Sequence, residues 1–242
     1  MSPKFQFNNL IVYSVLCASL IALGASLRIV YFFVPRAVEW GKSATLQCHY
    51  DVENDRLHRI TWAKDDRRFF RFSARDNKSE VTNVKGVHVD SSKSNSTHVT
   101  IDRVDADSDG IYSCEVQTKG PAFKTVFTES KLSVFYLPKD SLYIEGVDSS
   151  YKENNLIRMT CISRPSFPVT KLLWTINGET ALPKQVSRMQ IITQQEGLKV
   201  SKLELKFAAT RDYFRHGSLR LNCLGLIVLE VGKENKTIGD FS

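Results

Sequence analysis

The strongest constraint on the fold of this 242-residue chain is a repeated pattern of cysteine and tryptophan. The pattern occurs twice, first as Cys48, Trp62 and Cys114 and then as Cys161, Trp174 and Cys223. The cysteines are 66 positions apart in the first copy and 62 in the second. The chain is long enough for two small domains, and the internal repeat predicts one domain around each copy.

This spacing is typical of immunoglobulin domains, in which two cysteines join the sheets of a β-sandwich and a tryptophan packs on their bond. The pattern therefore implies two disulfides, Cys48–Cys114 and Cys161–Cys223, with Trp62 and Trp174 as core residues. Closing a loop of this length stabilises a domain by roughly 4 kcal/mol in the chain-entropy model. Tyr112 stands two positions before Cys114, where the hydroxyl of a tyrosine corner bonds to backbone upstream.

Apolar and polar residues alternate in short runs through both halves of the chain. The run GKSATLQC places Ala44, Leu46 and Cys48 on one face, and an Asn177-Gly178 turn follows the similar run KLLWTI. We predict an all-β fold of two tandem immunoglobulin-like β-sandwiches after a signal peptide. The first is variable-like, with room for an extra strand, and the second is less regular, because Leu221 replaces the corner tyrosine.

The N-terminus predicts export. An apolar stretch over residues 10–25 follows Lys4 and ends in small residues, which is typical of a secretory signal peptide. We assign residues 1–26 to the signal peptide, 27–136 to the first domain and 137–242 to the second. An uncleaved signal-anchor is the alternative, because LRIVYFFV continues the apolar run with only Arg28 interrupting it.

Three sequons, at Asn77, Asn95 and Asn235, predict N-glycosylation and agree with an oxidising, extracellular compartment. The C-terminal VLEVGKENKTIGDFS shows no apolar tail. We therefore expect a secreted protein, or one tethered to the cell surface if the chain continues beyond this point.

Enzymatic chemistry finds no support in the sequence. The five histidines lack zinc-ligand spacing, there is no CxxC, and no GxSxG, Walker A or GxGxxG motif occurs. We expect no catalytic residues, no cofactor and no metal. The net charge of +7 and the pI of about 9.1 favour acidic partners. Nucleic acid is not expected for an exported protein.

Several runs resemble the beaten path (Beat) family of arthropod proteins. They include ITWAKDDRRFFRF, DGIYSCEV, FKTVFTESKLSVFYLP and, in the second half, MTCISRPSFPVTKLLWTINGE. The resemblance covers almost the whole chain after the signal peptide. One position departs from the common immunoglobulin pattern: Ser108 stands where most domains carry an aspartate, paired with an arginine.

The resemblance implies a secreted or membrane-tethered protein of the nervous system with two immunoglobulin domains. It implies a role in axon guidance and synaptic partner matching, through binding of the first domain to an extracellular receptor of the Sidestep family. Contact with a membrane would then occur only through a receptor or an unseen anchor. A secreted protein of immune or glycosaminoglycan recognition is the alternative.

Alternation places candidate partner-binding residues on one sheet of the first domain. Interfaces favour arginine and aromatic side chains at their energetic centre. We predict partner contacts at Arg59, Arg68, Phe70, Arg71, Phe72, Glu115 and Gln117. Strict alternation also predicts that Phe69 and Phe70 lie on opposite sides of their strand. In the alternative interpretation two of the phenylalanines seal the sandwich edge and the arginines are only solvated.

Six arginines crowd around the same predicted strands. They are Arg56, Arg59, Arg67, Arg68, Arg71 and Arg75. A basic patch of this kind predicts either an acidic receptor face or heparan sulphate as the partner. The sequence leaves both open.

Overall fold

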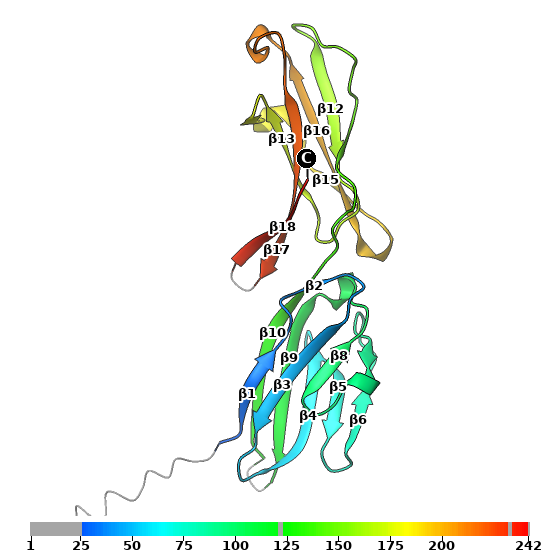
Figure 1. Ribbon diagram of the computed structural model, residues 1–242, viewed down its shortest axis with the longest axis vertical. Coiled ribbons are helices and arrows are strands. Elements are labelled where there is room, and N and C mark those ends of the chain that lie inside the picture. The colour runs from blue at the N-terminus through cyan, green and yellow to red at the C-terminus, as the bar shows by residue number, and fades with distance from the viewer. Residues whose placement is uncertain (1–25, 121–122, 232–233, 242) are drawn as a thin grey trace, which may run out of the picture.

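The computed structural model describes residues 26–120, 123–231 and 234–241. Within these residues the chain folds into two β-sandwiches that lie end to end along the long axis of the molecule (Figure 1). The other regular elements are short 3₁₀ turns, η1 (Ser91–Lys93), η2 (Ala106–Ser108), η3 (Pro183–Gln185), η4 (Gln195–Gly197) and η5 (Arg211–Tyr213). The predicted all-β fold with two tandem immunoglobulin-like domains is confirmed.

The first domain consists of a four-stranded and a six-stranded sheet. The smaller has the order β1–β3–β8–β7, formed by Arg28–Phe33, Ala44–Asp51, His98–Ile101 and Val89–Asp90. The larger has the order β2–β10–β9–β4–β5–β6, formed by Ala37–Glu39, Thr125–Phe135, Gly110–Lys119, Arg56–Lys64, Arg67–Ser73 and Lys78–Val81. Strand β2 is parallel to β10 and the other pairs are antiparallel. The strands β5 and β6 beyond β4 are the additions that distinguish a variable-type sandwich.

The predicted disulfide between Cys48 and Cys114 joins the two sheets of this domain. Trp62 lies directly opposite Cys114 in the β4–β9 pairing and is fully buried. Tyr112 is also buried, and its hydroxyl donates a hydrogen bond of 2.8 Å to the carbonyl oxygen of Ser108. Burial raises the pKa of Tyr112 far above its ordinary value, so the phenol stays protonated and keeps this donor. The predicted disulfide and the predicted tyrosine corner are both present.

Ser108 replaces the usual aspartate–arginine pair with hydrogen bonds at close range. Its buried hydroxyl donates to the carbonyl oxygen of Gly86 at 2.6 Å, and Asp105 accepts from the Ser108 backbone N–H at 3.0 Å. Gly86 has a φ of +74°, and a Cβ there would lie 2.1 Å from the carbonyl carbon of Asp107. The turn that contains Gly86 therefore packs directly against backbone, and a neutral hydrogen bond stands where an ion pair is common.

Two aspartates tie β9 to its neighbours at its N-terminal end. The backbone N–H of Asp65 donates to the carbonyl of Ile111, and the N–H of Ile111 donates to the Asp65 carboxylate, each at 2.9 Å. The ammonium of buried Lys64 pairs with the same carboxylate. The carboxylate of Asp109 accepts a 3.0 Å bond from the N–H of Val134 on β10. Burial raises the pKa of Asp109, whose carboxylate is half enclosed.

Strand β5 contains a β-bulge that overturns the prediction for Phe69 and Phe70. Phe70 pairs with Trp62, but Ala63 pairs with Arg68, so Phe69 is an extra residue opposite the β4 strand. A bulge turns consecutive side chains toward the same face. Both rings are fully buried, and Phe69 contacts the Tyr112 ring edge-on with 5.9 Å between ring centroids. The prediction that these rings lie on opposite sides is wrong.

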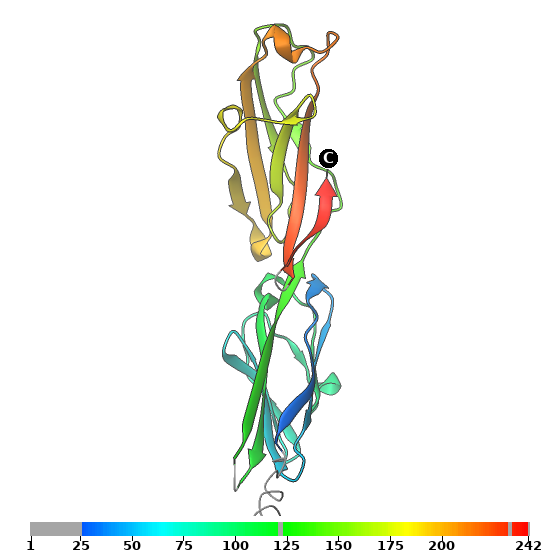
Figure 2. The same cartoon turned by 90° about the vertical axis from the view of Figure 1, so that its left-hand side faces the viewer.

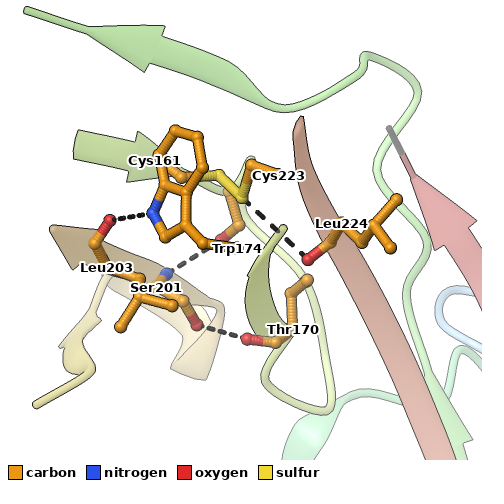
Figure 3. Close-up of a disulfide and its surroundings, with 8 residues drawn as sticks. Cys161, Thr170, Trp174, Ser201, Leu203, Cys223 and Leu224 are labelled. Atoms are coloured by element: carbon orange, nitrogen blue, oxygen red, sulfur yellow. Dashed lines mark hydrogen bonds between the residues drawn. A yellow bond between two sulfur atoms is a disulfide. The ribbon is translucent and has the colours of Figure 1, made fainter. Parts of the chain in front are cut away.

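The second domain has two four-stranded sheets. One has the order β11–β12–β16–β15, formed by Tyr143–Glu145, Leu156–Ile162, Lys199–Ala208 and Gln190–Thr193. The other has the order β14–β13–β17–β18, formed by Glu179–Thr180, Lys171–Ile176, Leu221–Val231 and Glu234–Phe241. Figure 3 shows the disulfide between Cys161 and Cys223 beside the buried ring of Trp174. The indole N–H of Trp174 donates to the carbonyl of Leu203 at 2.9 Å, whereas that of Trp62 has no acceptor among the described residues.

Backbone pairing and aromatic packing join the two domains directly after β10. Tyr136 exchanges two backbone hydrogen bonds with Phe167 of the second domain, at 2.7 and 3.1 Å. The ring of Trp40 meets both of these rings edge-on, with centroid distances of 6.3 Å to Tyr136 and 6.2 Å to Phe167. The segment between the sandwiches is thus held by contacts on both sides.

Strand β17 adds a second connection between the domains. Figure 2 shows its lower end reaching the upper end of β10. There the carbonyl of Glu230 accepts a 3.3 Å bond from the hydroxyl of Ser133, and its carboxylate lies 3.4 Å from the ammonium of Lys131. This ion pair is exposed and contributes little energy, so the hydrogen bond and the aromatic cluster carry the junction.

The predicted signal peptide lies outside the described residues except for Ser26. Leu27 is buried, and residues 28–33 pair with β3 as an edge strand of the first domain. The alternative in which LRIVYFFV extends a membrane anchor is therefore wrong for these residues. Across the part of the chain that the structure describes, no helix is long and apolar enough to cross a membrane.

Replacing Ser108 with alanine should lower the free energy of unfolding by about 1–3 kcal/mol, because the buried Gly86 carbonyl loses its donor. The exposed Ser43, whose hydroxyl donates to Asp102, is a matched control, and its alanine variant should change stability by less than about 0.5 kcal/mol. Urea denaturation of both variants measures the difference. Equal effects would contradict the assigned role of the Ser108 hydroxyl.

Acid should weaken the first domain through Asp65. Partial burial raises the pKa of Asp65, but hydrogen bonds from Lys64 and the Ile111 N–H outweigh burial and hold it below the ordinary 3.8. A carboxylate with a lowered folded pKa stabilises the fold above the unfolded pKa and loses that contribution as the pH falls through the folded pKa. Asp65→Asn should therefore reduce stability at pH 7 and flatten the fall in stability below pH 3.8. Thermal unfolding across pH measures this, and parallel profiles for the two proteins would refute it.

Candidate recognition face

The six-stranded sheet of the first domain has one buried side and one solvent-facing side, which we call the outer face. Burial alternates along β4, where Ile60 and Trp62 are buried and Arg59, Thr61 and Ala63 point outward. The same alternation on β9 brings Ser113, Glu115 and Gln117 to the outer face. These six positions confirm the sequence-based assignment of the two strands.

A single row of paired residues crosses the centre of the outer face. The pairing of β6, β5, β4, β9 and β10 aligns Glu80, Arg71, Thr61, Glu115 and Phe127. We call this set the central row. Arg71 and Glu80 form an ion pair of 2.7 Å, and Glu115 has no ion pair among the described residues. The row therefore presents a charge pair, an uncompensated carboxylate and an aromatic ring side by side.

Phe127 is the central-row residue that the sequence-based prediction missed. Its residue surface is 59% exposed, although phenylalanine is usually buried. Thr125, Glu129 and Lys131 share its exposed side of β10, while Leu132 beyond them is buried. The signal was present in the sequence as an aromatic residue among the polar positions of an alternating run. The exposed ring lies beside the Glu115 carboxylate, on a face that also carries Arg59 and Arg71. Aromatic and arginine side chains are the residues that interfaces favour.

Five of the seven predicted contact residues lie together on the outer face, one is buried in the core and one is half-buried. Arg68, Arg71, Glu115 and Gln117 lie on the outer face beside Arg59. Phe70 is fully buried in the core, so its predicted partner contact is wrong. Phe72 is half-buried and packs against the core cluster. Phe70 lies opposite the buried Trp62 and Phe72 opposite the buried Ile60, so both point to the inner side of the sheet and the predicted partner contact of Phe72 is wrong as well. The bulge then turns Phe69 inward beside Phe70.

The six arginines near β4 and β5 do not form one patch. Arg67 and Arg68 lie at the start of β5, opposite the end of β4, whereas Arg56 starts β4 and Arg75 follows the end of β5. Nine residues of β4 separate these ends by about 26 Å at the usual rise of a strand. Arg71, between them, is neutralised by Glu80.

None of the three predicted glycosylation sites belongs to the central row, although Asn77 is three positions from Glu80. Asn77 occupies the turn between β5 and β6, Asn95 lies between η1 and β8 on the other sheet, and Asn235 is on β18. All three residues are exposed. The Asn95 carboxamide oxygen accepts from the backbone N–H groups of Thr97 and His98, at 2.8 and 3.1 Å. Glycosylation itself stays a prediction.

The described part of the chain contains no candidate metal site. No group of three or more histidine, cysteine, aspartate or glutamate side chains could hold a metal ion there. All four described cysteines are in disulfides, so none of them is a free thiol nucleophile. What the outer face offers is recognition by shape and charge.

Comparison with known proteins supports the fold and the type of the first domain. The profile of the immunoglobulin V-set domain matches residues 34–135. No curated protein sequence matches the chain. Among solved structures, "Rst D1-D2" has a TM-score of 0.54 at 18% identity, covering 90% of this chain and 98% of that one. The amphioxus IgVJ-C2 molecule has a TM-score of 0.47 at 16% identity, covering 85% and 99%.

The profile match and the strand order of the larger sheet agree on the first domain. The Rst structure shares the two-domain architecture, and at this identity it supports the fold alone. Residues 34–135 therefore form an immunoglobulin V-set domain, and the second domain has an immunoglobulin-like β-sandwich fold.

Proposed function

We propose that this chain is a secreted or cell-surface recognition protein of the nervous system that binds an extracellular immunoglobulin-superfamily receptor through its outer face. The observation that carries this proposal is Phe127, an exposed ring on a sheet face that also offers arginine and carboxylate side chains. V-set domains are typically binding modules rather than enzymes, which agrees with such a face.

The receptor class comes from the sequence resemblance to the beaten path family. That resemblance points to a Sidestep-like receptor, and to axon guidance and synaptic partner matching as the process. Two of the runs that carry it, ITWAKDDRRFFRF and FKTVFTESKLSVFYLP, supply much of β4, β5 and β10. The residues that suggest the family are therefore largely the residues that build and flank the outer face.

The chemistry of the central row suggests how the receptor is bound. Burial of an exposed aromatic ring supplies affinity, because apolar surface is removed from water. Glu115 forms no ion pair among the described residues. It would therefore gain from a cationic or hydrogen-bond donor group on the partner, which gives selectivity. The overall charge of +7 speeds encounter with an acidic partner.

A binding screen of the secreted protein against a panel of extracellular immunoglobulin receptors identifies the partner. For that partner, Phe127→Ala should weaken binding by about 30-fold or more, which corresponds to about 2 kcal/mol for a residue at an interface centre. Phe33→Ala on β1 is the matched control, because Phe33 is 41% exposed on the other sheet. Surface plasmon resonance measures both affinities.

A charge reversal at Glu115 provides an independent variant on the same face. Glu115→Arg should abolish detectable binding, while Lys206→Glu on the second domain should leave it unchanged. Both side chains are accessible to solvent, so neither change disturbs a core. If Phe127→Ala and Glu115→Arg bind the receptor as tightly as the unmodified protein, the outer face is not the contact surface.

A further inference from the structure

A second surface of the first domain carries a cleft that the receptor proposal does not use. The cleft, of about 610 Å³, lies at the end of the sandwich opposite the domain junction, since β10 runs from Thr125 toward that junction. Four residues with cationic or titratable nitrogen groups line it, Arg56, His58, Arg75 and Lys119, and Leu57 and Phe123 add apolar surface. In Figure 1 this is the lower end of the molecule.

The positive charges of the cleft are not compensated within the described residues. Arg56 and Lys119 are directly opposite each other in the β4–β9 pairing. Like charges at such positions repel and destabilise a sheet. No described residue that lines the cleft is acidic, and the neighbouring Asp55 is paired with Lys124 at 3.0 Å. An anion bound between Arg56 and Lys119 would replace this repulsion with two attractive contacts.

We propose that this cleft binds the sulfate and carboxylate groups of a sulfated polysaccharide. A cleft of this volume holds a few sugar units rather than the flat face of a folded protein. Guanidinium groups bind anionic oxygens in a bidentate manner, and the ammonium of Lys119 adds a point charge. The ring of Phe123, which is 65% exposed, offers a surface for the C–H face of a pyranose.

The chemistry of the compartment favours a sulfated sugar over nucleic acid. Both disulfides require an oxidising environment, which is where exported proteins fold. Sulfated glycosaminoglycans are the abundant polyanions outside the cell. The cleft lies at the edge of the outer face and excludes Phe127 and the rest of the central row, so a glycan and a receptor can occupy the first domain at the same time.

The test uses the whole secreted chain and a heparin hexasaccharide as the probe. The double variant Arg56→Ala/Lys119→Ala should bind the hexasaccharide about tenfold more weakly and elute from heparin resin at lower salt. Its matched control is Lys184→Ala/Arg188→Ala, which removes the same charge from two exposed positions of the second domain. Neither cleft residue is buried and their charges repel, so neither variant should unfold at a lower temperature than the unmodified protein.

Four outcomes would overturn the assignment. Unchanged heparin binding by the cleft variant excludes the site, and an equal loss in the control variant shows an effect of net charge alone. Loss of receptor binding with heparin binding intact makes the cleft an acidic-protein site. Equal competition by a single-stranded DNA of matched charge removes the preference for sugar. Phe127→Ala should keep full heparin affinity, so failure of the receptor proposal is distinguishable from failure of this one.

Discussion

The disulfide between Cys48 and Cys114 is the constraint on which the first domain depends, because it ties β9 of the six-stranded sheet to β3 of the four-stranded sheet. Strand β9 pairs with β4 on one side and β10 on the other, so its position sets theirs. Hydrogen bonds from Tyr112 to Ser108 and from Val134 to Asp109 then fix the position of β9 along its own axis. Once β9 is held in this register, alternation places the side chain of Glu115 on the outer face.

The features that depend on local alternation and on cysteine spacing were predictable from the sequence. The two disulfides, the buried tryptophans, the tyrosine corner and the outward residues of β4 and β9 all follow from these two patterns. The side of the strand on which Phe69 and Phe70 lie was not predictable, because the run RRFFRF fits two registers equally well. Only its pairing with β4 selects the register with the bulge. The exposure of Phe127 was predictable from the alternation of β10, but only the β9–β10 pairing places its ring beside Glu115.

The basic cleft shows a different limit of sequence reasoning. Arg56 and Arg75 are visible as a charge cluster, but Lys119 joins them only through the β4–β9 pairing. The β4–β5 pairing separates them from Arg67 and Arg68, although all four arginines lie close together in the sequence. Local sequence therefore predicts the amount of charge on this domain. The antiparallel course of the strands decides where each charge collects.

The junction between the domains bears on how the molecule carries load. Strand β10 runs from the far end of the first domain to Phe135, and Tyr136 is bonded to the second domain immediately afterwards. Tension between the two ends of the molecule would thus pull β10 lengthwise past β9. Eight residue pairs join these strands side by side, and lengthwise sliding strains them together rather than in succession. The first domain would therefore resist a pull along the long axis through all eight pairs of β9 and β10 at once.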